Sequence, residues 1–202
     1  MCRAREGRTM HEHLDLKRKK TYAALLRAFE ALMKEKSFDE LTVHELCQRA
    51  EVGRNTFYAH FEDKYAFFQY YITLRKEQIE AVSAAPGDDF LAFRLRVVKE
   101  LFVYLRDNRF IWEKNISSPS AWKLRDMMKD NVKAPLIEEL TKLEQQSGRR
   151  LAVSKNLLAS FYASGIIEVF TESLYNERIP EQQVLEDLER ICALLFKDAL
   201  FE

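Results

Sequence analysis

Glycine and proline are scarce in this chain, with five glycines and four prolines among 202 residues. A glycine-rich phosphate-binding loop therefore has few residues to form it, and neither an HExxH segment nor a nucleophile and base at recognisable spacing is present. No stretch alternates apolar and polar residues as a half-buried strand does. These absences predict an all-α protein and make an enzyme the weakest of the functional hypotheses.

Cysteine occurs only three times, at Cys2, Cys47 and Cys192, far apart in the sequence. An odd number without CxxC spacing indicates neither a disulfide framework nor a zinc site. Cys47 and Cys192 fall on or beside apolar helix stripes, where a thiol packs as a small apolar group. We therefore expect no metal and no cofactor.

Long apolar runs are also missing, because none approaches the ~18 residues that a membrane-spanning helix needs. The basic, polar N-terminus lacks the apolar segment of a secretory signal peptide. We therefore predict a cytoplasmic protein that has no membrane partner.

No excess of one charge sign marks the chain, since Lys plus Arg and Asp plus Glu both number 32. Residues 1–64 carry 13 basic and 11 acidic side chains, a net charge of only +2. The sharpest basic feature is the run Lys17, Arg18, Lys19 and Lys20. A charge run is usually a solvated helix face, so any contact with nucleic acid has to come from local context.

Residues 41–64 contain the most informative pattern, two short helices separated by a three-residue turn. Thr42 can cap the first helix, and Glu45 three residues later completes a capping box. After residues 51–53 break the pattern, Phe57 and Phe61 are four apart and share one buried face of a second helix. This arrangement predicts a helix-turn-helix. The apolar residues of its first helix are Val43, Leu46, Cys47 and Ala50.

The second helix of a helix-turn-helix lies in the major groove, with its N-terminal residues at the base edges. Arg54, Asn55 and Thr56 stand at that position. Arginine can pair with guanine and asparagine with adenine, whereas Tyr58 and His60 are better suited to phosphates. Beside this motif we also expect DNA contacts from Lys17, Arg18, Lys20, Thr42 and His44.

A dense run of residues in this segment follows a known family pattern: Thr56, Phe57, Tyr58, His60, Phe61 and, three residues later, Lys64. It resembles the DNA-binding domain of TetR-family transcriptional regulators, and the resemblance implies a double-stranded DNA operator as partner and a phosphate contact for Lys64. Two positions depart from the pattern, Glu51 where the family usually has a turn glycine and Gly53 where it usually has a serine cap. A left-handed Glu51 costs ~1 kcal/mol, and Gly53 caps without a side-chain oxygen.

Helical periodicity divides the chain into three parts. We predict a flexible arm over residues 1–15, a three-helix helix-turn-helix DNA-binding domain over 16–64, and a C-terminal helical ligand-binding and dimerisation domain over 65–202. A long helix that begins at Lys64 and ends before Pro86 serves both domains. Pro135 lies within a helical pattern and should kink or restart that helix.

Two long C-terminal stretches carry more apolar surface than one small domain can easily bury. The TetR resemblance implies that they pair with a second copy as a four-helix bundle, giving a homodimer. A two-fold pair that reads a near-palindromic operator also makes more base contacts than one recognition helix can. An intramolecular core is the alternative. The expected interface residues are Leu158, Phe161, Gly165, Val169, Leu188, Ile191 and Leu195.

The same resemblance implies a pocket between the middle helices whose small apolar or aromatic ligand releases a repressor from DNA. The candidate lining residues are Phe102, Tyr104, Trp112, Trp122 and Tyr162, with Asn115, Glu168 and Glu172 as polar anchors. The alternative is a filled core with an exposed apolar patch, in which case a partner protein controls a DNA-bound adaptor or coactivator.

Overall fold

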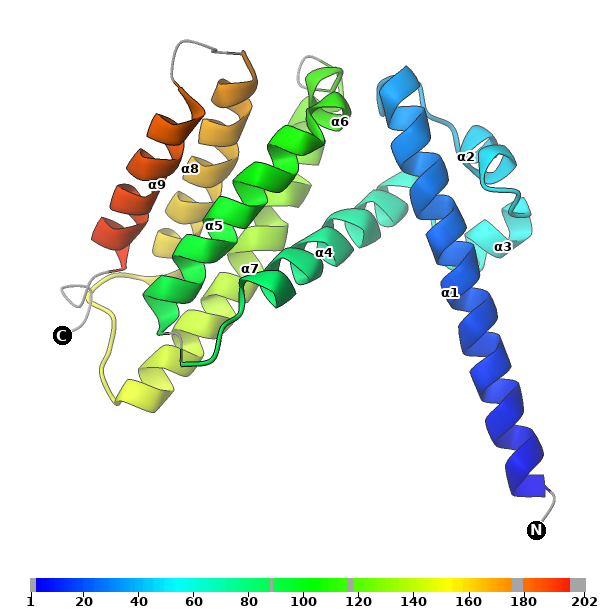
Figure 1. Ribbon diagram of the computed structural model, residues 1–202, viewed down its shortest axis with the longest axis horizontal. Coiled ribbons are helices and arrows are strands. Elements are labelled where there is room, and N and C mark those ends of the chain that lie inside the picture. The colour runs from blue at the N-terminus through cyan, green and yellow to red at the C-terminus, as the bar shows by residue number, and fades with distance from the viewer. Residues whose placement is uncertain (1–2, 88, 116–117, 176–179, 197–202) are drawn as a thin grey trace. The chain divides into compact units, whose positions relative to one another are not determined.

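The computed structural model describes residues 3–87, 89–115, 118–175 and 180–196, and these form nine helices and no strand (Figure 1). The all-α prediction is confirmed. The chain divides into two compact units, residues 1–71 and 72–202. None of the described helices has both the length and the apolarity that crossing a membrane demands. The helices are α1 (Arg3–Glu35), α2 (Val43–Arg49), α3 (Arg54–Tyr58), α4 (Lys64–Ser83), α5 (Phe90–Asp107), α6 (Arg109–Glu113), α7 (Ala121–Ser147), α8 (Lys155–Tyr175) and α9 (Glu181–Leu195).

Helix α1 is longer than the sequence pattern indicated, because it begins at Arg3 and includes the residues predicted as an arm. Residues 3–15 contain no proline, and Ala, Arg, Glu, Leu and Met within them are good helix formers. Nothing local therefore ends the helix before the basic run that starts at Lys17.

Aromatic rings fill the core of the first unit. Phe29, Phe38, Phe57, Phe67 and Phe68 are each at most 1% exposed. The ring centroid of Phe67 in α4 lies 5.5 Å from that of Phe29 in α1 and 6.1 Å from that of Phe57 in α3. Because packed rings exclude water and attract one another in tilted and edge-on arrangements, this cluster holds α1, α3 and the start of α4 together.

Helix α2 begins at the capping box that the sequence predicted. The Glu45 amide donates to Thr42 Oγ1 at 3.2 Å, and the Thr42 amide donates to a Glu45 carboxylate oxygen at 3.1 Å. These bonds satisfy donors that a helix N-terminus otherwise leaves unpaired. At the other end of α2, both guanidinium nitrogens of Arg49 lie 2.9 Å from the carboxylate of Glu35 in α1. The helix is therefore fixed at both ends.

The charged groups around this cap stabilise the ionised form of Glu45. The Lys36 ammonium, 2.5 Å away, and the hydroxyl and amide of Thr42 lower the pKa of Glu45 to about 2. A carboxylate whose pKa is lower in the folded state than in the unfolded state stabilises the fold above its ordinary pKa. That contribution shrinks as the pH falls below the ordinary pKa of the carboxyl group and is gone once the pH is below about 2.

The turn between α2 and α3 contains a left-handed residue, since the φ of Glu51 is 55°. Among the described residues other than glycine, none besides Glu51 has a positive φ. The Val52 amide donates to the Cys47 carbonyl at 2.9 Å and holds the turn closed. Gly53 then caps α3 with extended backbone and no side-chain hydrogen bond. Both departures from the family pattern therefore have the conformations that the sequence suggested.

The second unit is built on α5, α7, α8 and α9, with α8 packed along α7 and α9 along α5 (Figure 1). Helix α7 continues through Pro135 and does not restart there. Leu136 and Leu140, on the buried side of α7, are 0% and 1% exposed, and this packing outweighs the hydrogen bond that proline removes. The buried core contains Val98, Phe102, Leu136, Leu140, Leu158, Ala159, Tyr162, Ile166, Leu188, Cys192 and Phe196.

Polar contacts tie the second half of α4 to its neighbours in this unit. The Asn131 side-chain amide of α7 donates to the Ile72 carbonyl at 3.2 Å, and the Thr73 hydroxyl donates to Asn131 Oδ1 at 2.9 Å. Near the other end of α4, Arg96 Nε of α5 donates to the Ser83 carbonyl at 2.8 Å. Residues 72–83 of α4 are thus fixed to both α5 and α7.

We predict that Glu51→Gly raises the free energy of unfolding by up to about 1 kcal/mol. Removing Cβ relieves left-handed strain of ~1–2 kcal/mol, and the greater freedom of the unfolded chain offsets ~0.4–1 kcal/mol of that gain. Glu51→Ala is the matched control, because it removes the carboxylate but keeps Cβ. Urea unfolding of both variants measures the difference, and equal stability of the two would show that the turn is not strained at this residue.

Candidate DNA-binding and regulatory sites

Helix α3 presents a polar row at the surface because Phe57 turns in the opposite direction. Phe57 is 0% exposed, whereas Arg54, Asn55 and Thr56 are all exposed. Tyr58 is 55% exposed. The three residues predicted to meet base edges therefore lie together at the exposed N-terminal end of α3, where a helix-turn-helix reads DNA.

Arg18 and His60, both predicted to contact phosphate, meet on Tyr22. Arg18 Nε donates to the Tyr22 hydroxyl at 3.1 Å, and the His60 ring lies edge-on to Tyr22 with 5.2 Å between centroids. Lys17 and Lys20 are exposed on the same stretch of α1. Tyr22 thus joins the basic run to the end of the recognition segment. The spacing of four between Arg18 and Tyr22 is the sequence signal for this contact.

Thr42 and His44 are both exposed at the start of α2, as a DNA contact requires. The Thr42 hydroxyl, however, donates to the Glu45 carboxylate at 2.8 Å and accepts from the Glu45 amide. A hydroxyl has a single proton, so none remains for a phosphate oxygen. The expected DNA contact of the Thr42 side chain is corrected to a capping role.

The Lys64 side chain binds backbone groups within the first unit. Its Nζ donates to the backbone carbonyls of Phe38, Asp39 and Leu41 at 2.8, 3.0 and 2.9 Å. An ammonium group has three donors, so all three are engaged by the loop between α1 and α2. Burial lowers the pKa of Lys64 below its ordinary value. The implied phosphate contact is therefore corrected, and Lys64 fixes the start of α4 to this loop.

Helices α8 and α9 leave an apolar face exposed in the second unit. Leu157 and Phe161 of α8 are 69% and 64% exposed, and Ile191 and Leu194 of α9 are 46% and 67% exposed. Exposed apolar side chains that gather on neighbouring helices indicate an interaction surface more strongly than scattered ones do. We call these four residues the α8/α9 face.

Some of the predicted interface residues are exposed on these helices, and others face the buried core. Phe161, Gly165 and Ile191 are exposed, and Val169 and Leu195 are half-buried. Leu158 and Leu188 are 6% and 5% exposed and belong to the buried core, which corrects their assignment. Because adjacent helix positions differ by about 100°, the exposed residue beside Leu158 is Leu157. Leu157 and Leu194 were not predicted as interface residues. Apolar periodicity does not show which apolar stripe of a helix packs in the core and which is exposed.

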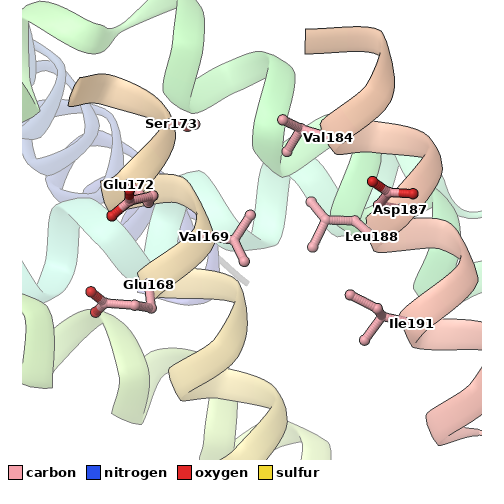
Figure 2. Close-up of a pocket in the computed structure, with 8 residues that line it drawn as sticks. All are labelled: Glu168, Val169, Glu172, Ser173, Val184, Asp187, Leu188 and Ile191. Atoms are coloured by element: carbon pink, nitrogen blue, oxygen red, sulfur yellow. The ribbon is translucent and has the colours of Figure 1, made fainter. Parts of the chain in front are cut away.

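A groove of about 310 Å³ lies between α8 and α9 (Figure 2). Val169 of α8 points toward Leu188 across it, and Val184 and Ile191 complete the apolar wall on α9. Glu168, which was predicted as a polar anchor for a ligand, lines this groove and not an aromatic pocket. The other carboxylates along it are Glu172 and Asp187.

The remaining predicted ligand residues do not surround one cavity. Phe102 and Tyr162 fill the buried core, and Trp122 is 63% exposed. Trp112 and Asn115 line a cavity of about 30 Å³, where only a water molecule or two would fit. Aromatic residues at helical spacing fill a core as readily as they line a pocket, which is why the sequence grouped them. Tyr104 is half-buried on α5.

Residues 25–71 match the family model of bacterial regulatory proteins of the tetR family. This segment holds the aromatic core, the helix-turn-helix and the start of α4, so the match covers the polar row of α3 and the parts that orient it. Residues 25–71 are therefore a DNA-binding domain of the TetR type. TetR-family regulators are non-enzymatic DNA-binding proteins.

Several solved structures share this fold over most of the chain. A TetR-family transcriptional regulator from Syntrophomonas wolfei has a TM-score of 0.68 at 14% identity, covering 90% of this chain and 97% of its own. RolR in complex with resorcinol has a TM-score of 0.61 at 17% identity and covers 92% of each chain. The dihydroxyacetone kinase operon activator DhaS has a TM-score of 0.56 at 17% identity, covering 90% and 98%. No curated protein matches the chain by sequence.

We predict that Lys64→Met lowers the free energy of unfolding by about 2 kcal/mol, because three carbonyls lose a charged donor. The slope of operator affinity against salt should stay unchanged, since no phosphate contact is lost. Lys36→Met is the control, because Lys36 forms a half-exposed ion pair with Glu45 whose loss should change the stability much less. Chemical unfolding and salt-dependent operator titrations measure both quantities. If Lys64→Met left the stability unchanged and reduced the salt slope of operator binding by about one, the phosphate contact of Lys64 would be supported after all.

Proposed function

We propose that this TetR-family regulator is a homodimeric repressor that binds a near-palindromic operator and is released by a small-molecule ligand. The observation that carries the DNA-binding part is the exposed row Arg54, Asn55 and Thr56 at the start of a helix anchored by Phe57. Side chains at that position of a recognition helix reach base edges. Around the row, Lys17, Arg18, Lys20, Tyr58 and His60 supply exposed groups for phosphates.

The α8/α9 face supports the homodimer. Its residues are all apolar and between 46% and 69% exposed, so leaving them in water is unfavourable. A two-fold axis between two copies covers the same face on both, and it also supplies two recognition helices for the two half-sites of a near-palindromic operator. Dimerisation thus buries the apolar face and doubles the base contacts.

The release step rests on α4, which starts in the DNA-binding unit and ends in the second unit. Asn131 and Arg96 tie residues 72–83 of α4 to α7 and α5. A ligand that prefers one arrangement of these helices can change operator affinity only by that preference, and the operator must weaken ligand binding by the same factor. The structural relative RolR, crystallised with resorcinol, is consistent with a small aromatic ligand in this fold.

A second candidate function is a DNA-bound adaptor or coactivator controlled by a partner protein. Two observations favour it: the cavity beside Trp112 and Asn115 is only about 30 Å³, and the structural relative DhaS is an operon activator. In this case the α8/α9 face or a neighbouring surface binds the partner protein. Operator affinity would then respond to that protein and to no small molecule.

We predict that Arg54→Ala weakens operator binding by ~1–3 kcal/mol and relaxes the preference at one base, because Arg54 reads a base edge. Lys20→Ala is the control, since a phosphate contact should weaken binding to all sequences alike and reduce the salt slope by about one. Binding to a randomised operator pool measures both effects. An unchanged base preference in Arg54→Ala would remove Arg54 from the readout.

We predict that Phe161→Glu yields a helical monomer with weak operator affinity, because a buried, unpaired charge costs several kcal/mol at an interface. Phe161 is 64% exposed, so the monomer itself tolerates the change. Val82→Glu is the control, being an apolar residue that is 72% exposed on α4. Light scattering gives the mass and circular dichroism the helix content. A Phe161→Glu dimer of unchanged mass would place the interface elsewhere.

A further inference from the structure

A second groove of about 520 Å³ lies in the C-terminal unit, between the segment after α4, the first turn of α5 and the C-terminal half of α7. Its volume falls within the ~300–1,000 Å³ of small-molecule sites. Phe90 and Phe93 of α5 and Leu143 of α7 give it apolar walls, and Glu139 and Lys142 of α7 contribute charge. None of the residues predicted from the sequence to bind a ligand lines it.

Arg94 lies directly behind the wall of this groove. It is only 3% exposed and forms an ion pair with Glu139. Its guanidinium carbon is 5.7 Å from the ring centroid of Phe90 and 5.5 Å from that of Phe93. Since Glu139, Phe90 and Phe93 all line the groove, the guanidinium lies next to three of its lining side chains.

The hydrogen-bonding capacity of Arg94 is not used up. Within the described part of the chain, its buried Nε has no hydrogen-bond partner, and neither has the hydroxyl of Ser83, which is 1% exposed and precedes the groove residue Ala84. A buried donor without a partner is unfavourable, so an oxygen acceptor that reached it would be bound firmly. The planar guanidinium presents its donors as a fork that matches a carboxylate.

The charged side chains that line the groove are Asp89, Glu139 and Lys142. Asp89 caps α5, where its carboxylate accepts from the Ala92 amide at 2.7 Å, and Glu139 is paired with Arg94. Lys142 has no ion-pair partner among the described residues. The charged groups left to act on a ligand are therefore Lys142 and the free donor of Arg94. A monoanion suits apolar walls better than a phosphate dianion, whose desolvation costs more.

We propose that this groove binds a small carboxylate with an aromatic or aliphatic body, held by Arg94 and Lys142 and packed on Phe90, Phe93 and Leu143. The proposal names the chemical class of the effector and rests on the ligand-released repressor proposed above. The site also adjoins α4, because Ala84 and Ala85 line it and Arg96 holds the Ser83 carbonyl. An occupant therefore acts on the end of the helix that continues into the DNA-binding unit.

The test is calorimetric titration of the full-length protein with benzoate and hexanoate, and with benzyl alcohol and benzylamine as neutral and cationic matches. Benzoate or hexanoate should bind, and the neutral and cationic probes should bind at least about tenfold more weakly. Arg94→Met should weaken carboxylate binding about 10-fold to 100-fold. Arg106→Met is the matched control, because Arg106 is an exposed, ion-paired arginine on the same helix and should leave binding unchanged.

Ala85→Phe provides a second variant, since it fills the groove from an exposed position and leaves Arg94 in place. It should also abolish carboxylate binding, and it keeps the test decisive where Arg94→Met fails to fold. Failure of both carboxylates to bind, tighter binding of benzylamine, or unchanged binding in Ala85→Phe would overturn the site. Operator titrations separate this result from the proposed function: bound benzoate that leaves operator affinity unchanged keeps the site and removes the release mechanism.

Discussion

The DNA-binding face of this regulator depends on the burial of one ring, that of Phe57. Helix α3 has only five residues, far fewer than the ~12–15 that an isolated helix needs to persist in water. Its orientation is therefore set by Phe57, which is fully buried and lies 5.4 Å from Phe61 and 6.1 Å from Phe67 between ring centroids. With this face fixed inward, Arg54, Asn55 and Thr56 must face outward. In the preceding turn, short-range hydrogen bonds from the Glu51 amide to the Gln48 carbonyl and from the Val52 amide to the Cys47 carbonyl hold the left-handed backbone of Glu51.

Lys64 gives α4 a fixed start within the first unit. Three carbonyls of the loop between α1 and α2 accept from its ammonium group, and that loop precedes the capping box of α2. In the second unit, Asn131 and Arg96 fix residues 72–83 of the same helix. Polar contacts therefore hold α4 at both ends, and side-chain packing alone does not have to position it. The same helix therefore has polar anchors in both units.

The sequence predicted most of the helices and the architecture of the helix-turn-helix, because local rules decide them. The capping box at Thr42 and the shared face of Phe57 and Phe61 follow from short-range spacing, whereas the turn conformation at Glu51 was suggested by the TetR resemblance. Lys64 was misassigned because its three acceptors come from residues 23 to 26 positions earlier, which no local pattern reveals. Leu158 and Leu188 were misassigned for a related reason: α8 and α9 are apolar on more than one side, and only the packing of α7 and α5 shows which side is buried. The second groove, beside Arg94, was missed because the sequence alone does not show whether an arginine in an apolar helix is buried or solvated.

The two grooves of the C-terminal unit have different consequences if the proposed dimer forms. The groove between α8 and α9 shares Ile191 with the α8/α9 face, so a second copy packed on that face covers it or narrows it. None of the residues that line the groove beside Arg94 belongs to α8 or α9; they are Ala84, Ala85, Asp89, Phe90, Phe93, Glu139, Lys142, Leu143 and Gln146. This groove therefore remains accessible when two copies pair through those helices. A ligand confined to the first groove would have to compete with the partner subunit, and would act by dissociating the dimer. A ligand in the second can bind an intact dimer on its operator and alter DNA affinity through α4, which is the requirement for release by a freely exchanging small molecule.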